Sequence, residues 1–279
     1  TKKYTTWIEE TNDGAGVVKG LFGTVIFDYP KTPQLLNKFL KMANIDDGDI
    51  ILDFFSGSAT TAHAVMQLNA EDGGNRKFIM VQLPESTDEK SEAYKAGYSN
   101  ICEIGKERIR RAGKKIKEQL EQDNQQTTIE NLDSATHAQD DKDLDIGFRV
   151  LKQGSTNMKD VYYSPQEYNP TLFSSLTDNI KEDRTPEDLL FQVMLDLGVL
   201  LSSKIEESVI AGKKVFNVAD GFLIACFDDD VTEETVTAIA QEKPYYAVFR
   251  DSSYASDSVA TNFEQIFATY SPDTVRRVL

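Results

Sequence analysis

Residues 49–61 read DIILDFFSGSATT, and they set the architecture of the first half of the chain. The apolar run that ends at Asp53 predicts a strand, and an apolar helix is expected from Thr60 to Asn69. A strand–turn–helix of this kind aims backbone N–H groups and the positive end of a helix at one point. Such a point suits the anionic or polar end of a nucleotide-like cofactor. The sequence therefore predicts a cofactor turn between Asp53 and Thr60.

The neighbouring segments complete a βαβ unit. Residues 76–83 contain the continuous apolar run FIMV, which is typical of a strand buried on both faces of a parallel sheet. Upstream, Thr32 and Pro33 form a good N-cap and first-turn pair for a helix over about 33–44. Strand, helix and strand in this order predict an α/β fold.

Bulk composition excludes several classes of protein. The chain has 279 residues, 40% of them apolar, which is enough to bury the core of one large or two ordinary domains. No run of about 18 apolar residues and no basic-then-apolar leader is present, so neither a membrane span nor a secretory signal is readable, and a cytoplasmic location is expected. Cys102 and Cys226 are expected to be reduced packing residues. With two histidines and no paired cysteines, no metal site is expected.

Charge divides the chain into two parts. Residues 1–125 carry 17 Lys and Arg against 19 Asp and Glu, a net of −2, whereas the remainder carries 13 against 27, a net of −14. Between them, residues 118–143 are rich in Gln, Asn, Asp and Thr, the composition of a linker or an exposed loop. We therefore place a domain boundary near residue 125, with domains at 1–125 and 126–279.

A long helix capped by Ser99 is expected to follow the βαβ unit, with Ile104, Ile109 and Ile116 on its apolar stripe. Its remaining surface is crowded with cations, which are Lys106, Arg108, Arg110, Arg111, Lys114, Lys115 and Lys117. Such a charge run is usually a solvated face. Contact with phosphate is the alternative, and the sequence leaves both open.

The second half is predicted to be a smaller α/β or α+β domain. The segment 185–188 reads TPED and starts an apolar helix expected to run to about residue 211. Two β-rich segments, 214–219 and 222–227, flank Asp220-Gly221, the dipeptide that a type I′ hairpin turn prefers. A short helix from Thr232, a strand over 245–249 and a helix over 258–269 are expected to follow.

The chemistry of the turn is suggestive rather than specific. Small residues such as Ser56, Gly57, Ser58 and Ala59 also serve tight helix–strand packing. The functional interpretation gains from Glu85, which is placed after the next strand, where a carboxylate can accept hydrogen bonds from ribose hydroxyls. A dinucleotide site typically has three glycines, whereas S-adenosylmethionine has no pyrophosphate and tolerates a turn with fewer.

Three clusters of residues closely resemble a known family. They are FDYPK at 27–31, LDFFSGSATTAHAV at 52–65 and NRKFIMVQLPE at 75–85. The family is the modification subunit of type III restriction–modification systems, whose members are amino-methyltransferases of the permuted beta order that methylate the exocyclic amine of adenine in DNA. The resemblance extends to FRDS at 249–252 and TNFEQIF at 261–267, so it spans most of the chain.

The resemblance implies a Rossmann-like S-adenosylmethionine-dependent half-domain followed by a smaller domain. It identifies the cofactor turn as Asp53, Phe54, Ser56, Gly57, Ser58 and Thr60, with Glu85 on the ribose and Lys31 at the methionyl carboxylate. Two departures stand out. The family usually has Gly where Ala59 stands, and its lysine is usually followed directly by proline, whereas here Thr32 intervenes.

The catalytic loop of this family, Asp/Asn-Pro-Pro-aromatic, does not occur in the sequence. The resemblance places that loop upstream of the lysine motif, so we expect this chain to be a carboxyl-terminal portion with no catalytic residue of its own, inactive by itself. The whole subunit would have DNA, a restriction (helicase/nuclease) subunit and a second copy as partners.

Two other interpretations stay open. In one, the chain is a non-catalytic module that docks the restriction subunit, which suits the acidic second half because phosphate binding needs clustered cations. In the other, the chain is a nicotinamide-dependent oxidoreductase, since that class shares a strand–turn–helix with a downstream acid.

Overall fold

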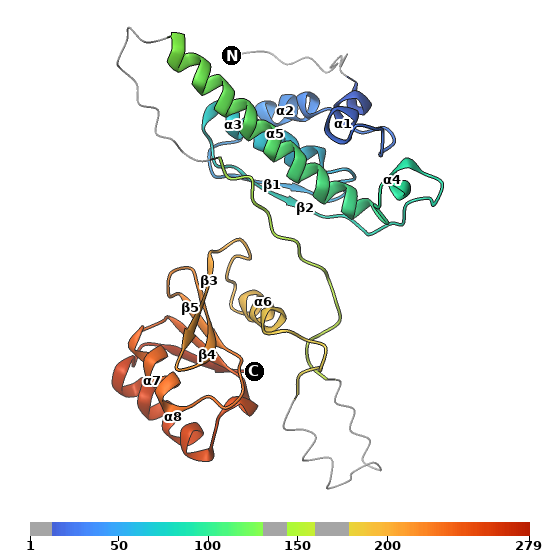
Figure 1. Cartoon of the computed structure of the whole chain (residues 1–279). Coiled ribbons are helices and arrows are strands. Elements are labelled where there is room, and N and C mark those ends of the chain that lie inside the picture. The colour runs from blue at the N-terminus through green and yellow to red at the C-terminus, as the bar shows by residue number, and fades with distance from the viewer. Residues whose placement is uncertain (1–12, 131–143, 160–178) are drawn as a thin grey trace. The chain divides into compact units, whose positions relative to one another are not determined.

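A computed structural model describes residues 13–130, 144–159 and 179–279 (Figure 1). The chain has a mixed α/β fold and divides into two compact units, 1–148 and 149–279. The division therefore falls after residue 148, not near residue 125. Among the described residues, every helix is too short or too polar to cross a bilayer.

The first unit contains two strands and five helices among its described residues. They are α1 (Gly14–Phe22), α2 (Pro33–Met42), β1 (Ile50–Asp53), α3 (Thr60–Asp72), β2 (Lys77–Met80), α4 (Glu92–Lys95) and α5 (Ile101–Glu130). Strands β1 and β2 pair in parallel, with Ile50 opposite Lys77 and Asp53 opposite Met80. The predicted βαβ unit is thus confirmed. The Thr32 hydroxyl caps α2 as expected, by accepting a hydrogen bond from the Leu35 N–H at 3.2 Å.

Helices cover one face of the β1–β2 sheet (Figure 1). Ile51 and Phe78 point into a core with Leu40 of α2 and Val65 of α3. Phe78 also packs with the α5 side chains that lie against α3. Because side chains alternate between the two faces of a strand, the inward residues of β1 and β2 pack directly against α3. The turn before α3 is therefore held at one end by β1 and at the other by α3.

The other face of the sheet is exposed. Ile50, Leu52 and Ile79 are 54%, 59% and 50% exposed, and Val81 continues the row at 38%. The expectation that the second strand is buried on both faces is therefore wrong for this chain. Within the described residues no layer of structure covers the outward side.

Helix α5 is longer than expected and explains the shifted boundary. It is capped by Asn100, whose side-chain oxygen accepts a hydrogen bond from the Glu103 N–H at 3.1 Å, and not by Ser99. It continues to Glu130 through the first half of the predicted linker. The rest of that linker, 131–143, lies outside the described residues. Leu144, Ile146 and Phe148 then pack onto the first unit, where a Cβ on Gly113 would come within 2.9 Å of Ile146 Cβ.

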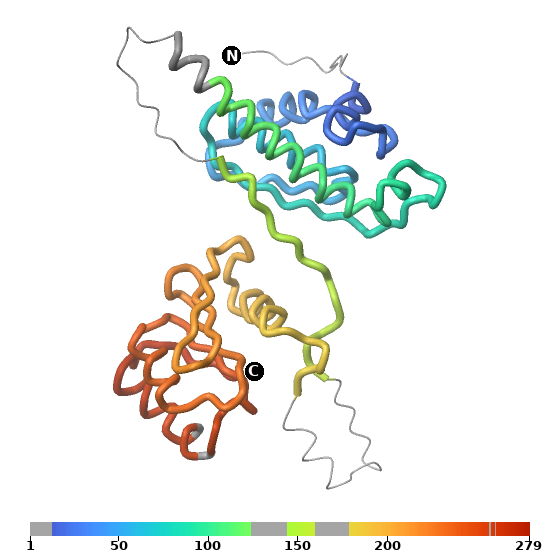
Figure 2. The backbone as a smooth tube through the Cα atoms, in the orientation of Figure 1, coloured from blue at the N-terminus to red at the C-terminus, as the bar shows by residue number. Residues whose placement is uncertain are grey.

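The second unit has one five-stranded sheet and four helical elements in its described part. They are α6 (Pro186–Asp196), β3 (Ile205–Ile210), β4 (Lys213–Val218), β5 (Leu223–Cys226), α7 (Glu233–Gln241), β6 (Tyr246–Phe249), the 3-10 helix η2 (Asp251–Ser253), α8 (Asp257–Tyr270) and β7 (Val275–Val278). The strands follow the order β3-β4-β5-β6-β7. The first three are antiparallel, and β5, β6 and β7 are parallel, joined through α7 and α8 as the tube in Figure 2 traces.

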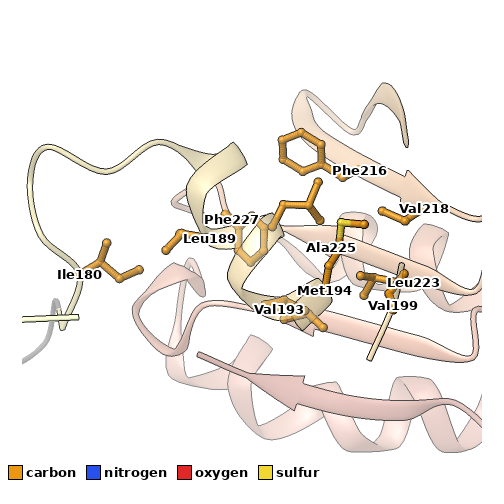
Figure 3. Close-up of a cluster of buried hydrophobic side chains, with 12 residues drawn as sticks. Ile180, Leu189, Val193, Met194, Val199, Phe216, Val218, Leu223, Ala225 and Phe227 are labelled. Atoms are coloured by element: carbon orange, nitrogen blue, oxygen red, sulfur yellow. The ribbon is translucent and has the colours of Figure 1, made fainter. Parts of the chain in front are cut away.

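Helices cover both faces of the central strands of this sheet. On one side, α6 contributes Leu189, Val193 and Met194 to a core with Phe216 of β4 and Leu223 of β5 (Figure 3). On the other side, α7 and α8 pack over the alternate strand residues. The second unit is thus a three-layer α/β/α domain, consistent with the predicted α/β character.

The helix expected over 185–211 is wrong in its second half. A capping box between Thr185 and Asp188 starts α6 as predicted, but the helix ends at Asp196. Gly198 adopts φ +69° and the Val199 N–H donates to Met194 O at 2.7 Å, the pattern of a Schellman motif. Residues 205–210 instead form the edge strand β3.

The hairpin at Asp220-Gly221 is confirmed. Both residues have positive φ, +51° and +91°, and the Phe222 N–H donates to Ala219 O at 3.2 Å, as a type I′ turn requires. A second hairpin with Ala211 and Gly212 at positive φ joins β3 to β4, and it was not anticipated. Strand β7 was not anticipated either.

Candidate cofactor-binding site

The turn between β1 and α3 is held by the strands on either side of it. The parallel ladder continues past β1, since the Val81 N–H donates to Asp53 O at 2.9 Å and the Ser56 N–H donates to Val81 O at 3.1 Å. Inside the turn, the Ala59 N–H donates to Ser56 O at 2.7 Å. The turn is therefore a rigid extension of the sheet rather than a free loop.

Two residues of the turn have left-handed backbone conformations. Gly57 has φ +52° and Ala59 has φ +58°. A Cβ on Gly57 would meet only the Phe27 ring, at 3.4 Å, so the backbone angle is the main reason for glycine there. Ala59 takes the same conformation with a side chain, at a cost of roughly 1–2 kcal/mol. The departure from the family's glycine is thus accommodated by local strain.

The start of α3 has no side-chain cap among the described residues, because Ala59 occupies the N-cap position. Asp53 does not serve as the cap. Its carboxylate, half-buried at the end of β1, accepts a hydrogen bond from the Thr61 hydroxyl at 2.5 Å. The positive end of a 13-residue helix therefore faces the turn without a protein anion bonded to its first N–H groups.

Two predicted site residues flank the turn. Lys31 reaches it through its main chain, since the Thr60 hydroxyl donates to Lys31 O at 3.4 Å, and the Lys31 side chain is exposed. Glu85 lies beyond the end of β2 with an exposed side chain, and its carbonyl accepts from the Ile101 N–H at 3.0 Å. The structure brings Asp53, Ser56, Gly57, Ser58 and Thr60 together in one turn, and it shows no direct contact between that turn and the carboxylate of Glu85.

Aromatic side chains stand at the edge of the turn. Phe54 and Phe55 are 61% and 74% exposed, with their rings edge-to-face at 5.1 Å. Tyr29, two residues before Lys31 in the sequence, is 94% exposed and has φ +53°. Exposed aromatic rings beside a polar turn can provide an apolar wall for a ligand's flat ring.

Sequence reasoning missed two supporting residues. Gln82 accepts a hydrogen bond from the Gly57 N–H through its side-chain oxygen at 2.7 Å, so it sets the plane of that peptide.

Arg108, which the sequence groups with surface cations, is fully buried. Its Nη1 donates to Ser58 Oγ at 2.6 Å and to Thr60 Oγ1 at 2.7 Å. Both the solvated and the phosphate-contact interpretations are wrong for Arg108. Its position on the α3-facing side of α5, next to Ile109 and Ile104, is the signal that could have revealed this.

Burial shapes the electrostatics beneath the turn. Burial lowers the pKa of Arg108 to about 10, so it stays protonated at neutral pH. His63, in the first turns of α3, has a pKa lowered to about 3, first by burial and then by the charge of Arg108. The imidazole is therefore neutral, and the buried side of the turn carries one positive charge.

Comparison with known proteins relates this turn to a family. Residues 3–114 match the family model described as DNA methylase. The chain is 45% identical over 117 residues to the Mod subunit of the type III restriction-modification enzyme StyLTI of Salmonella typhimurium, covering 42% of this chain and 18% of that protein. It is 32% identical over 243 residues to the EcoP15I Mod subunit of Escherichia coli, covering 85% of this chain and 32% of that protein.

A third relative is the Mod subunit of EcoPI from Escherichia phage P1, at 32% identity over 166 residues, 58% of this chain and 24% of that protein. The chain thus spans between about a fifth and a third of the length of these curated relatives. The turn, the βαβ unit and the first part of α5, up to residue 114, lie in the part that the family model covers. Residues 3–114 thus match the DNA methylase family model, and the chain is similar to the Mod subunits of type III restriction-modification enzymes.

Proposed function

We propose that the chain carries the cofactor-binding part of a Mod-type DNA adenine methyltransferase, which transfers a methyl group from S-adenosylmethionine to the 6-amino group of adenine in DNA. The observation that carries the proposal is the turn before α3. Two left-handed residues lead into an uncapped helix N-terminus there, and the buried cation Arg108 donates hydrogen bonds to Ser58 and Thr60. The match to the DNA methylase family model and the similarity to Mod subunits support methyl-donor binding at this turn.

The described residues fit this cofactor. Asp53, Ser56, Gly57, Ser58 and Thr60 would hold its methionine end, with the exposed Lys31 available to pair with the carboxylate. Phe54 would line the side of the pocket, and Glu85 would accept hydrogen bonds from the ribose. When bound, S-adenosylmethionine supplies an electrophilic methyl group on a sulfonium. The residues of this chain bind and orient it, and no residue here acts on the adenine.

A doubly wound, Rossmann-like sheet accounts for the exposed strand face. Ile50, Leu52, Ile79 and Val81 form an apolar row that a two-stranded sheet leaves in water. We infer that in the whole protein further strands and a second helical layer extend and cover this sheet. The Asp/Asn-Pro-Pro-aromatic loop would come with that missing part, so this chain alone should bind cofactor without methylating DNA.

The second unit supports an assembly role. Its acidic character disfavours unaided DNA binding, and Leu195, Leu200 and Val209 are 64%, 64% and 74% exposed. We propose that it contacts either a second copy or the restriction subunit. Sedimentation velocity over a hundredfold range of concentration tests self-association: a dimer of the chain supports the first, and a strict monomer leaves the restriction subunit as the partner.

Isothermal titration of the chain with S-adenosylmethionine tests the cofactor proposal, and NAD is the matched control ligand. We expect one site for S-adenosylmethionine and no heat with NAD. Binding of NAD alone would favour the oxidoreductase interpretation, and binding of neither would contradict both.

Two substitutions locate the site. Gly57→Val forces a β-branched side chain into a left-handed backbone conformation, and Asp53→Ala removes the carboxylate that fixes Thr61. We expect each to weaken binding at least about tenfold, equivalent to about 1.4 kcal/mol. Gly23→Ala, at φ +82° outside the turn, controls for strain at a left-handed residue. Unchanged affinity in both site variants would place the cofactor elsewhere.

A further inference from the structure

The buried guanidinium of Arg108 lacks the partner that such a group normally has. Arg108 is 0% exposed, on a helix where Lys106, Arg110, Arg111 and Lys114 pair with neighbouring carboxylates, Lys106 with Glu103 at 2.6 Å. In the described part of the chain no carboxylate pairs with Arg108, and its Nε and Nη2 are buried without a hydrogen-bond partner. A buried charge left unpaired is strongly unfavourable. A compensating anion is therefore expected close by.

The geometry directs the charge of Arg108 to the turn. Helix α5 approaches the turn closely, since a Cβ on Gly105 would lie 3.5 Å from Gly57 O. From that close approach, the guanidinium reaches the Ser58 and Thr60 hydroxyls at 2.6 and 2.7 Å, and Ser58 O at 3.5 Å. Ser56 and Gly57 are half-buried, so Arg108 lies on the inner side of the turn and a ligand would lie on the outer side.

The Ser58 and Thr60 hydroxyls link the positive charge of Arg108 to the turn. A guanidinium only donates hydrogen bonds, so Ser58 Oγ and Thr60 Oγ1 act as acceptors toward Arg108. The Thr60 hydroxyl gives its proton to Lys31 O, and the Ser58 hydroxyl points its proton away from Arg108. Hydrogen bonds that are in series in a low-dielectric interior polarise one another. The unbonded N–H groups at the start of α3 add their partial positive charge to the same place. The charge of Arg108 and the start of α3 both favour a negative charge on the outer side of the turn.

We propose that Arg108 is a positioning residue that completes an anion subsite at the Ser58–Thr60 turn, and that the anion is the carboxylate at the methionine end of the cofactor. This inference rests on the proposed function. Arg108 does not touch the ligand. It orients the two hydroxyls, holds the turn in shape and supplies the positive charge that the carboxylate neutralises.

Ligand analogues separate this role from simple packing. The experiment titrates the whole chain, calorimetrically, with S-adenosylmethionine and with decarboxylated S-adenosylmethionine, which lacks only the carboxylate. The variants are Arg108→Met, which keeps the length of the side chain without its charge, and Arg108→Lys, which keeps a charge. Lys114→Met, at an exposed position on α5, is the control for the loss of one cation.

We expect Arg108→Met to weaken S-adenosylmethionine binding about tenfold or more and to change binding of the decarboxylated analogue less than about twofold. Arg108→Lys should recover part of the loss, and Lys114→Met should change neither ligand. Equal losses for both ligands, or no loss for either, would overturn the inference while leaving the proposed function in place.

Ser58→Ala serves if Arg108→Met does not fold, which circular dichroism reveals. It removes one hydroxyl and leaves the buried cation, and the same preferential loss of S-adenosylmethionine binding is expected. If Ser58→Ala weakens both ligands equally, the inference is wrong. Failure of the wild-type chain to bind either ligand would overturn the proposed function, and the inference with it.

Discussion

At the scale of single residues, His63 makes the stability of the core beneath the turn depend on pH. Its pKa falls from 6.5 to about 3 on folding, mainly because burial disfavours the charged ring. The unfolded chain therefore takes up a proton as the pH falls below about 6.5, and the folded chain does not. The stability from a neutral His63 is complete above that pH and is lost progressively as the pH falls toward 3.

Comparison with His63→Gln measures this effect. Between pH 7.5 and 5.5, the wild-type chain should lose about 1.4 kcal/mol more unfolding free energy than the variant, because only the wild type has this imidazole. Urea denaturation at both pH values, followed by circular dichroism, gives the two differences. Parallel losses in both proteins would mean that folding does not lower the pKa of His63.

The residues of the turn show what sequence reasoning can and cannot reach. Asp53, Ser56, Gly57, Ser58 and Thr60 are consecutive or nearly so, and a strand followed by small residues brings them together wherever the strand ends. Arg108 and Gln82 join them only through packing of α5 and β2. A cation on a charged helix looks like a surface residue in the sequence, and only the tertiary contact buries it.

At the scale of elements, the side chains on the two faces of β2 should contribute very differently to the free energy of unfolding. Phe78 packs into the core beneath the sheet, whereas Ile79 points outward at 50% exposure. We expect Phe78→Ala to lower the unfolding free energy of the first unit by about 2–3 kcal/mol, and Ile79→Ala by under about 1 kcal/mol. Chemical denaturation of the two variants tests this. A large loss for Ile79→Ala would show that the outward face is covered in solution.

The end of α6 offers a second test at this scale. Gly198 has φ +69° in the Schellman motif, with open space where a Cβ would be. Gly198→Ala should therefore destabilise the second unit by about 1 kcal/mol through backbone strain alone. Gly20→Ala, in the helical backbone of α1 with equal space, should instead stabilise the first unit by up to about 1 kcal/mol. Shifts of the same sign, measured by thermal unfolding, would contradict this assignment.

Elements with strong local signals were predictable, and those that depend on pairing were not. Thr32, Thr185 and Thr232 cap helices where the sequence places them. In contrast, residues 205–210 follow an apolar helix with no proline between, and their strand character comes from pairing with β4. Likewise, the polar residues up to Glu130 read as a linker, yet they continue α5.

At the scale of the whole molecule, the two compact units should respond to the cofactor separately. A ligand held by the β1–α3 turn stabilises only the unit that binds it. At a hundred times its Kd, S-adenosylmethionine should raise the unfolding free energy of the first unit by about 2.7 kcal/mol. Differential scanning calorimetry with and without the cofactor measures this, and an equal upward shift of every transition would indicate that the units unfold as one.

The placement of the cofactor is tested most directly by a crystal structure of the chain soaked with S-adenosylmethionine. We predict the methionine end against Gly57 and Ser58 at the start of α3, and the ribose hydroxyls within hydrogen-bonding distance of the Glu85 carboxylate. Density for the cofactor at another place in the chain, or a turn that remains empty at saturating concentration, would contradict the assignment of this turn as a methyl-donor site.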